Sequence, residues 1–163
     1  SVDSNGLRVN YEGSGELGEV GAIRANHPIP PQCKLFYFEV DIIDEGKHKT
    51  IGIGFCEKDV DLNSVHGCED GYWGYHGGDD TYFRCSGRSN TYEPLFSTGD
   101  TIGCWLNFKN STVFYTKNGI SLGSVSFHNL KGTLHPCLGV RSQGASMEVN
   151  FGSRKFKFAS NTE

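Results

Sequence analysis

Apolar and polar residues alternate along many short runs of the chain, which is the pattern of β-strands that bury one face. The run 36–42 is the clearest, because its first, third, fifth and seventh residues are all apolar. In the run 50–55, isoleucine and phenylalanine alternate with Gly52 and Gly54. A strand face made of glycine lets another backbone or a large side chain approach closely. Both runs predict strands with one face in a hydrophobic core.

Two further runs, 101–107 and 112–117, are joined by a short polar turn. The second run leads into Asn118 and Gly119, the residue pair preferred in two-residue hairpin turns of type I′. We therefore expect three consecutive strands that pair as a meander.

The runs 134–140 and 147–151 predict another hairpin, with its turn at 141–144. Shorter runs that also fit strands are 7–11, 21–24, 72–76 and 156–158. No stretch keeps the helical spacing of apolar residues over three turns. About ten short strands without helices bury a face only as a barrel or as two stacked sheets. We favour an all-β sandwich of two antiparallel sheets, because bulky aromatics and isoleucines suit a core layer about 10 Å thick.

The composition excludes several classes of protein. A chain of 163 residues has the usual length of a single domain, and a domain of this size can form a stable core without a structural metal or a disulfide bond. Disorder is excluded, because 11 Phe, 7 Tyr and 2 Trp supply area to bury and the net charge is only −4. The 22 glycines indicate many tight turns. Nucleic acid is not an expected partner, because there is no general positive charge to bind phosphate.

The six cysteines form no CxxC pair or other close spacing typical of a zinc site or a redox motif. Several lie in apolar runs, such as 53–56 and 102–104, which predicts buried free thiols. The chain shows no charged-then-apolar leader at its start and no apolar run approaching the ~18 residues of a membrane span. We expect no membrane association and a location in the reducing cytoplasm, with the nucleus as an additional compartment.

No arrangement of catalytic or metal-binding residues stands out. The histidines lack metal-ligand spacing, and there is neither a G-x-S-x-G nucleophile motif nor a phosphate-binding loop. The run 59–70 imitates a calcium loop, but Ser64 stands where the loop needs glycine and Asp70 where it needs glutamate. We therefore expect neither an enzyme nor a bound metal or cofactor.

Aromatic residues gather in the glycine-rich segment 71–84. Aromatic, histidine and arginine side chains on rigid turns supply contact area at low entropic cost, as recognition surfaces require. Strand alternation favours a different interpretation, in which Trp73 and Tyr75 fill the core. Both interpretations remain open for each aromatic residue of the segment.

Several short motifs stand out along the chain. They are Arg24-Ala25-Asn26-His27-Pro28-Ile29-Pro30, Phe36-Tyr37-Phe38-Glu39-Val40, Ile51-Gly52-Ile53-Gly54, Gly74-Tyr75-His76-Gly77, Gly99-Asp100-Thr101-Ile102-Gly103-Cys104, Phe114-Tyr115-Thr116-Lys117-Asn118-Gly119, His135-Pro136 and Asn150-Phe151-Gly152. These motifs and their order resemble those of SPRY domains, and most closely those of the Ran-binding protein M subgroup. The match extends over nearly the whole chain, so we expect a single SPRY domain over 1–163 with its core at about 7–158.

This resemblance implies a bent sandwich of two antiparallel sheets, no catalytic activity, and binding of protein partners through loops at one edge. Members of the subgroup are scaffolds of the CTLH (GID) ubiquitin ligase, in which separate LisH and CTLH helical regions mediate assembly. No such helical regions are expected in these 163 residues. The resemblance therefore implies the isolated binding module, monomeric by itself, of a protein that belongs to a larger ligase assembly.

In the related SPRY/SOCS-box proteins the peptide site consists of the loop matching 24–30, an aromatic residue at the position of Phe83, and the turn matching 141–144. Trp105 joins this set as an aromatic residue that points away from Cys104 and Leu106 by alternation, and it either covers the second sheet or contacts a partner. The expected contacts with a protein or short peptide are Arg24, Asn26, His27, Pro28, Tyr75, Tyr82, Phe83, Trp105, Arg141, Ser142 and Gln143.

Two other classes of function remain open. A lectin-like sandwich would stack a sugar on an exposed tryptophan, Trp105 or Trp73, although only the analogy of fold supports this. A cysteine-dependent enzyme would need a thiol with a low pKa.

Overall fold

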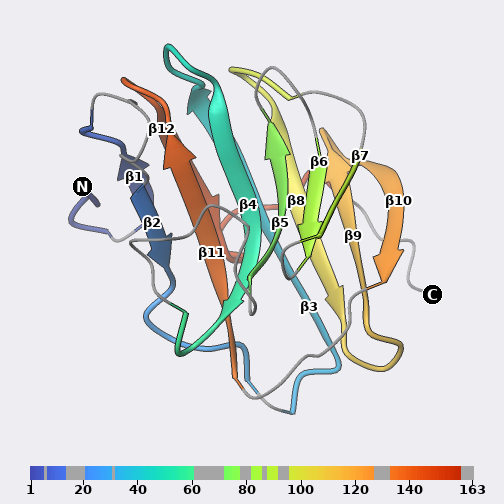
Figure 1. Ribbon diagram of the computed structural model, residues 1–163. Coiled ribbons are helices and arrows are strands. Elements are labelled where there is room, and N and C mark those ends of the chain that lie inside the picture. Colours follow the sequence, from blue (N-terminus) through green and yellow to red (C-terminus); the bar gives the residue numbers. More distant parts are fainter. Residues whose placement is uncertain are drawn as a thin grey trace.

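The computed structural model describes residues 1–5, 7–13, 21–30, 32–60, 72–77, 82–85, 88–91, 96–126 and 133–158. Of residues 72–73, 76–77, 82–85, 88–91 and 125–126 it describes the backbone alone. These residues form two six-stranded sheets, stacked face to face, in which every paired neighbour is antiparallel (Figure 1). The predicted all-β sandwich is confirmed.

In each sheet a strand from late in the chain lies between two early strands, and the strands beyond them follow in sequence order. The first sheet runs β1 (Arg8–Asn10), β12 (Ser146–Asn150), β3 (Leu35–Asp44), β8 (Thr101–Asn107), β9 (Thr112–Lys117) and β10 (Ile120–Ser126). The second sheet runs β2 (Gly21–Arg24), β11 (Leu134–Arg141), β4 (Thr50–Glu57), β5 (Tyr72–Gly77), β6 (Tyr82–Cys85) and β7 (Arg88–Thr91). The edge strands β1 and β2 lie near each other at one side of the sandwich (Figure 1).

The core lies between the sheets and follows the alternation of the sequence. On β3 the side chains of Phe38, Val40 and Ile42 are buried, and β4 buries its apolar residues in the same way. Complete burial of one such side chain stabilises the fold by about 1.5–3 kcal/mol. The Tyr115 hydroxyl crosses the core from β9 and donates a hydrogen bond to the Ile53 carbonyl oxygen at 2.9 Å. The two sheets are thus joined by a polar contact as well as by apolar packing.

The predicted meander is confirmed as β8, β9 and β10. Asn118 and Gly119 have positive φ angles of 51° and 86°, as a type I′ turn requires at both central positions. Because asparagine and glycine tolerate this conformation better than other residues, the turn sets where β9 ends and β10 begins.

The predicted hairpin of 134–140 and 147–151 is wrong. Both runs form strands, but β11 pairs in the second sheet and β12 in the first. Between them Ala145 is 1% exposed, and its N–H donates to the Ser142 carbonyl oxygen at 3.0 Å. The turn therefore connects a strand of the second sheet to a strand of the first. Its buried residues are small, so they fit between the two sheets.

The run 156–158, which was expected to be a strand, lies outside both sheets. Its two phenylalanines pack against Tyr37 of β3, with ring centroids 4.8 Å away for Phe156 and 5.7 Å away for Phe158. The apolar and polar residues of this run alternate because the two rings cover the outer face of the first sheet, whereas Lys157 between them is exposed.

Candidate functional site

The loop 25–30, which follows β2, is held at both ends by contacts with β11. At its start the Ala25 N–H donates to the Pro136 carbonyl oxygen at 2.9 Å. At its end the Ile29 N–H donates to the Leu134 carbonyl oxygen at 2.8 Å, and the Ile29 side chain is only 4% exposed. The loop is thus anchored by backbone and side chain, at the lower end of the sandwich in Figure 1.

Asn26, His27 and Pro28 lie between these anchors and are exposed. A further contact tightens the loop, because the buried His135 ring donates from Nδ1 to the Ala25 carbonyl oxygen at 2.9 Å. The ring of Pro28 also fixes its own φ. Because its backbone is already restrained, the loop loses little backbone entropy when a partner binds these three side chains.

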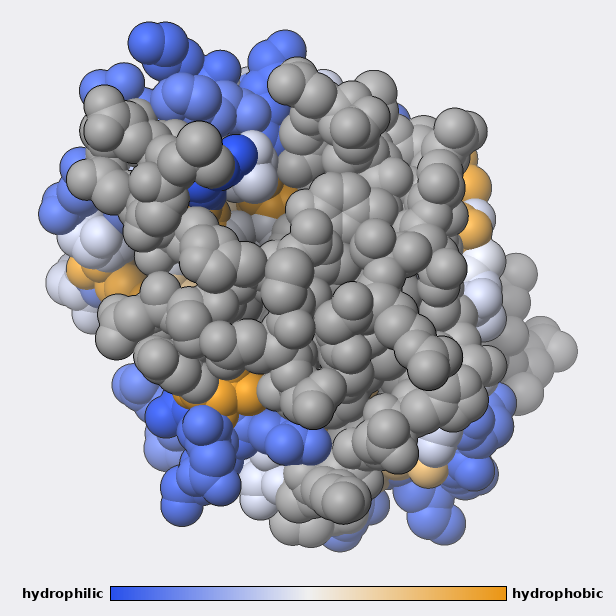
Figure 2. Space-filling view, in the orientation of Figure 1, coloured by the Kyte–Doolittle hydropathy of each residue, from blue (hydrophilic) through white to orange (hydrophobic). Residues whose placement is uncertain are grey.

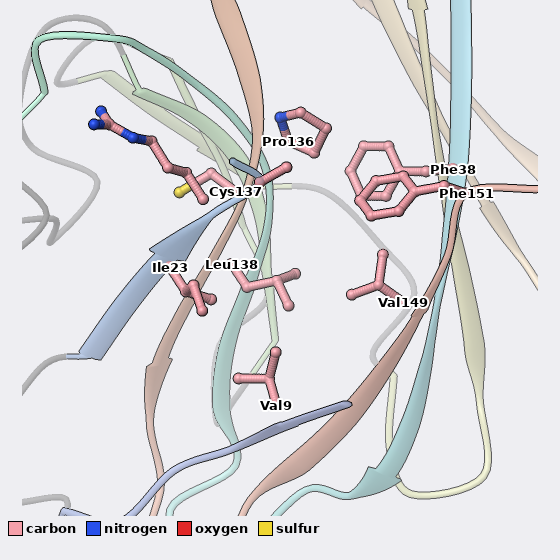
Figure 3. Close-up of a pocket in the computed structure, with 10 residues that line it drawn as sticks. Val9, Ile23, Phe38, Pro136, Cys137, Leu138, Val149 and Phe151 are labelled. Carbon is pink, nitrogen blue, oxygen red and sulfur yellow. The ribbon is translucent and has the colours of Figure 1, made fainter. Parts of the chain in front are cut away.

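An apolar cleft of about 60 Å³ opens beside the loop, between the edges of the two sheets (Figure 3). It is lined by Val9, Ile23, Arg24, Ala25, Phe38, Pro136, Cys137, Leu138, Val149 and Phe151. Phe38 and Phe151 lie side by side in it, with ring centroids 5.9 Å apart. A second hollow of about 360 Å³ shares Val9 and Ile23 with the cleft. Both follow the edge that β1 and β2 form.

Arg24 links the cleft to the loop, because it ends β2 and also lines the cleft. Its half-buried side chain donates a hydrogen bond from the guanidinium to the Lys58 carbonyl oxygen. Figure 2 shows hydrophilic residues gathered at the upper and lower ends of the molecule, with smaller apolar patches near its edges. The cleft therefore combines an apolar lining with one cationic group at a polar end of the sandwich, as peptide and ligand sites commonly do.

The turn 141–144, predicted to share this site, lies at the opposite end of the strands (Figure 1). Arg24 is the register partner of Cys137, four residues before Arg141 on β11. At a rise of about 3.3 Å per residue, roughly 13 Å separates the two positions along the strand. Gln143 and Gly144 are exposed there. The 24–30 loop and this turn therefore form two separate surfaces.

Ser142 belongs to neither surface, which corrects the expectation that it contacts a partner. Its side chain is fully buried. The hydroxyl donates to the Glu45 carbonyl oxygen at 2.6 Å and accepts the N–H groups of His48 at 3.1 Å and Lys49 at 2.9 Å. The residue instead fixes the loop between β3 and β4.

Tyr75 is likewise a core residue and not a contact, because none of its surface is exposed. Its ring lies 5.0 Å from that of Phe96 and 5.2 Å from that of Tyr115 on the other sheet. Alternation along β5 brings it inward, in agreement with the core interpretation of the aromatic segment.

Phe83 is the register partner of Tyr75 on β6, and Tyr82 is that of His76. Ile23 of β2 and Phe83 of β6 lie in one row of register partners that runs across five neighbouring strands. At the usual spacing between strands, the backbones of these two residues are about 19 Å apart. The side chains of Tyr82, Phe83 and Trp73 lie outside the described residues, as does most of the calcium-like run 59–70. Contacts by Tyr82 and Phe83 remain predictions.

Trp105 points away from the core, as alternation predicted. Its ring stacks on Phe114 with centroids 5.3 Å apart and an interplanar angle of 16°. Phe158 meets it edge-on at 5.9 Å, and Tyr37 lies 5.4 Å away. Trp105 therefore packs beneath the 156–158 segment on the outer face of its own sheet, and this packing uses ring surface that a sugar or a partner would need.

A buried carboxylate that the sequence analysis missed holds this segment in place. Glu39 is 2% exposed, and its two oxygens accept the Lys157 N–H at 2.6 and 3.1 Å. The Tyr37 hydroxyl donates to the same carboxylate at 3.2 Å. Burial, together with the negative charge of Glu39, raises the pKa of Tyr37. In the sequence, Glu39 occupies an outward position of the run 36–42. A charged side chain at such a position normally faces solvent, so polarity alone gives no sign of its burial.

The described cysteines agree with the prediction of buried free thiols. Cys56, Cys104 and Cys137 are buried, Cys33 is half-buried, and all four are free. Within the ranges given above, no three histidine, cysteine or acidic residues come together to hold a metal ion. The same part of the chain contains no helix that is both long and apolar enough to span a bilayer.

Comparison with known proteins agrees with this architecture. The family model of the SPRY domain matches residues 35–154. Human Ran-binding protein 9 is 42% identical over 158 residues, which cover 96% of this chain and 22% of that protein. The Ran-binding proteins 9/10 homolog of Drosophila melanogaster is 42% identical, over 96% and 16% of the two chains. The Ran-binding protein M homolog of Arabidopsis thaliana is 34% identical, over 96% and 34%. The chain thus spans between 16% and 34% of the length of these relatives.

Solved structures show the same fold. A human SPRY domain superposes with a TM-score of 0.76 at 28% identity, over 95% of this chain and 96% of that one. The SPRY domain of human HERC1 gives 0.77 at 17% identity, over 95% and 94%, and supports the fold alone. With the family match and the sequence relatives, these findings show that the chain belongs to the SPRY domain family and is of the Ran-binding protein 9/10 type.

Proposed function

We propose that this SPRY domain, a protein-interaction module by family, binds a short peptide or a loop of a partner protein at the 25–30 loop and the adjacent apolar cleft, without catalysing a reaction. The observation that supports this most is the position of the exposed residues 26–28 beside a cleft lined by Arg24 and apolar side chains. A loop anchored at both ends and a cleft that accepts one apolar side chain are complementary parts of a peptide site.

For the longer protein we propose a scaffold of the Ran-binding protein M type in a ubiquitin-ligase assembly, cytoplasmic and also nuclear. The support is the 42% identity with Ran-binding protein 9 across almost the whole chain. Because the domain corresponds to a fifth of that relative's length, other parts of such a protein would mediate assembly, and this domain would capture the partner.

The site predicts a specific result for the double variant Asn26→Ala, His27→Ala. We expect it to weaken the binding of a peptide selected on the wild-type domain from a displayed random library by about tenfold or more, or ~1.4 kcal/mol. The melting temperature should stay within about 2 °C, because exposed side chains away from special features contribute little to stability. Isothermal titration calorimetry and thermal denaturation measure the two effects.

Gln143→Ala is the matched control, because Gln143 is exposed at the opposite end of the same strands. Unchanged affinity in this variant supports a site confined to the 25–30 loop. Loss of affinity in the control with none in the loop variant would move the site to the 141–144 turn. Failure to select any peptide, despite capture of a folded partner, would contradict binding of a short linear segment.

We also propose that the domain extends to Phe158, beyond residue 154 where the family match ends. Phe158→Ala removes a half-buried ring that contacts Tyr37, Trp105 and Phe114. We expect the free energy of unfolding to fall by about 1.5–2.5 kcal/mol, half the usual cost for a buried phenylalanine. Lys155→Ala, an exposed change in the same segment, should leave it unchanged. Equal urea midpoints for the wild type and Phe158→Ala would place the boundary before this residue.

A further inference from the structure

Two of the buried cysteines lie next to each other on neighbouring strands. In the register of β4 and β11, Cys56 is opposite His135 and Cys137 is opposite Gly54. Residues two apart on a strand share a face, so both thiols lie on the same side of the second sheet, diagonally across the strand pair. Figure 3 shows the Cys137 sulfur and the Leu138 side chain on opposite sides of β11. The pair is thus on the outer face of the sheet.

The two thiols are in direct contact. They pack together in one buried cluster, with Cys56 0% and Cys137 1% exposed. Ala22 and Val60 pack against them. Because Gly54 opposite Cys137 has no side chain, the Cys137 sulfur can lean toward Cys56 without a clash.

The surroundings make the two sulfurs unequal. The neighbouring Cys137 thiol lowers the pKa of Cys56, with a further contribution from the positive charge of Arg24, whereas the Cys56 thiol and burial raise the pKa of Cys137. Cys104 provides a contrast within the chain, because burial raises the pKa of that thiol to about 12. Thiols that undergo reversible oxidation often stand next to a second, resolving thiol.

We propose that Cys56 and Cys137 are an oxidation site at which hydrogen peroxide converts the two thiols into a reversible cross-strand disulfide. This inference is independent of the proposed peptide site. The thiolate sulfur of Cys56 attacks one peroxide oxygen and the O–O bond breaks. The departing hydroxide takes up the proton that Cys56 released, which gives water and a sulfenic acid. The Cys137 sulfur then attacks the Cys56 sulfur, and the S–O bond breaks. The second hydroxide leaves as water with the Cys137 proton. Two thiols and one peroxide thus give one disulfide and two waters.

The diagonal placement also determines how stable the product is. Diagonal Cα atoms of an antiparallel pair are about 7–8 Å apart, and a relaxed disulfide rarely spans more than ~6.8 Å. Closing the bond must therefore draw β4 and β11 together locally. Strained disulfides have high reduction potentials and are reduced readily by cellular thiols. We expect a bond that forms under oxidation and is removed by glutathione.

The test uses the whole domain in its native state. After exposure to hydrogen peroxide and blocking of remaining thiols with N-ethylmaleimide, we expect a non-reducing digest to contain a linked pair of peptides bearing Cys56 and Cys137. This link should form in higher yield than any other pair of the six cysteines, and glutathione should remove it. A link that appears only after denaturation, or a preference for any other pair, would overturn the proposal.

Variants separate the two steps of the reaction. Cys137→Ser removes the second thiol, so dimedone should trap several-fold more sulfenic acid at Cys56 than in the wild type. Cys33→Ser is the control, because the half-buried Cys33 lies outside the pair and its loss should leave the link intact. Equal trapping at Cys56 with and without Cys137 would show that the two sulfurs do not react with each other. Mapping of the wild-type link decides the question even where a variant fails to fold.

Discussion

Replacing Tyr75 with alanine is expected to lower the free energy of unfolding by about 3–5 kcal/mol, the cost of removing a large buried aromatic side chain from a core. Tyr75 has no exposed surface, and its ring packs on Phe96 and on Tyr115 of the facing sheet. The cavity left by the ring would lie between the two sheets, where neighbouring strands cannot close on it without breaking their hydrogen-bonded register. Equilibrium unfolding in urea measures the loss.

Phe151→Ala is the comparison for this variant. Phe151 is also aromatic but 43% exposed, so its removal should cost clearly less. Partner binding by Tyr75→Ala, measured well below its unfolding midpoint, should equal that of the wild type per folded molecule. A Tyr75 variant that kept its stability and lost binding would return this residue to the contact surface.

Alternation along the chain predicted the strands well, because the two-residue period of side chains is a local property of extended backbone. The run 36–42 became β3 with the expected residues inward, and Asn118 and Gly119 marked the turn between β9 and β10. Both features depend on residues that are close in sequence. The stacking of two antiparallel sheets followed from them, because strands without helices have few other ways to bury one face.

The alternation of apolar and polar residues does not predict which distant strands pair with each other. The run 141–144 looked like a hairpin turn, yet β11 and β12 belong to different sheets. A polar turn between two strands is compatible with a hairpin or with a crossing, and the burial that distinguishes them depends on the rest of the fold. The expectation that the 24–30 loop and the 141–144 turn share one site was wrong for the same reason. The loop and the turn both match the peptide site of related SPRY proteins by sequence, but they lie at opposite ends of the sandwich.

Polarity also misled where a polar side chain has buried partners. Glu39 reads as solvent-facing by alternation, but the Lys157 N–H and the Tyr37 hydroxyl satisfy its carboxylate on a covered face. A sequence gives no sign of a segment more than a hundred residues away that folds over one residue. The two phenylalanines of 156–158 were recognised in the sequence, but their packing over the outer face of the first sheet was not predicted.

Ser142→Ala is expected to lower the free energy of unfolding by about 2–4 kcal/mol, although it removes a single oxygen atom. The hydroxyl accepts two backbone N–H groups, those of His48 and Lys49, and donates to the Glu45 carbonyl oxygen. Because Ser142 is fully buried, water reaches these groups poorly once the oxygen is gone. Each backbone group left without a partner costs about 1–3 kcal/mol. Urea unfolding and amide hydrogen exchange at His48 and Lys49 measure the two consequences, and both amides should exchange faster.

Gln143→Ala, the adjacent exposed change, controls for the substitution itself and should stay within about 0.5 kcal/mol of the wild type. Gly46→Ala tests the same loop from the other side. Gly46 has a φ of +71°, and a Cβ there would lie 2.4 Å from the Ser142 hydroxyl oxygen, so this variant should be destabilised as well. If Ser142→Ala kept full stability but lost partner binding, the hydroxyl would be a recognition group, and the 141–144 turn would become the site to pursue.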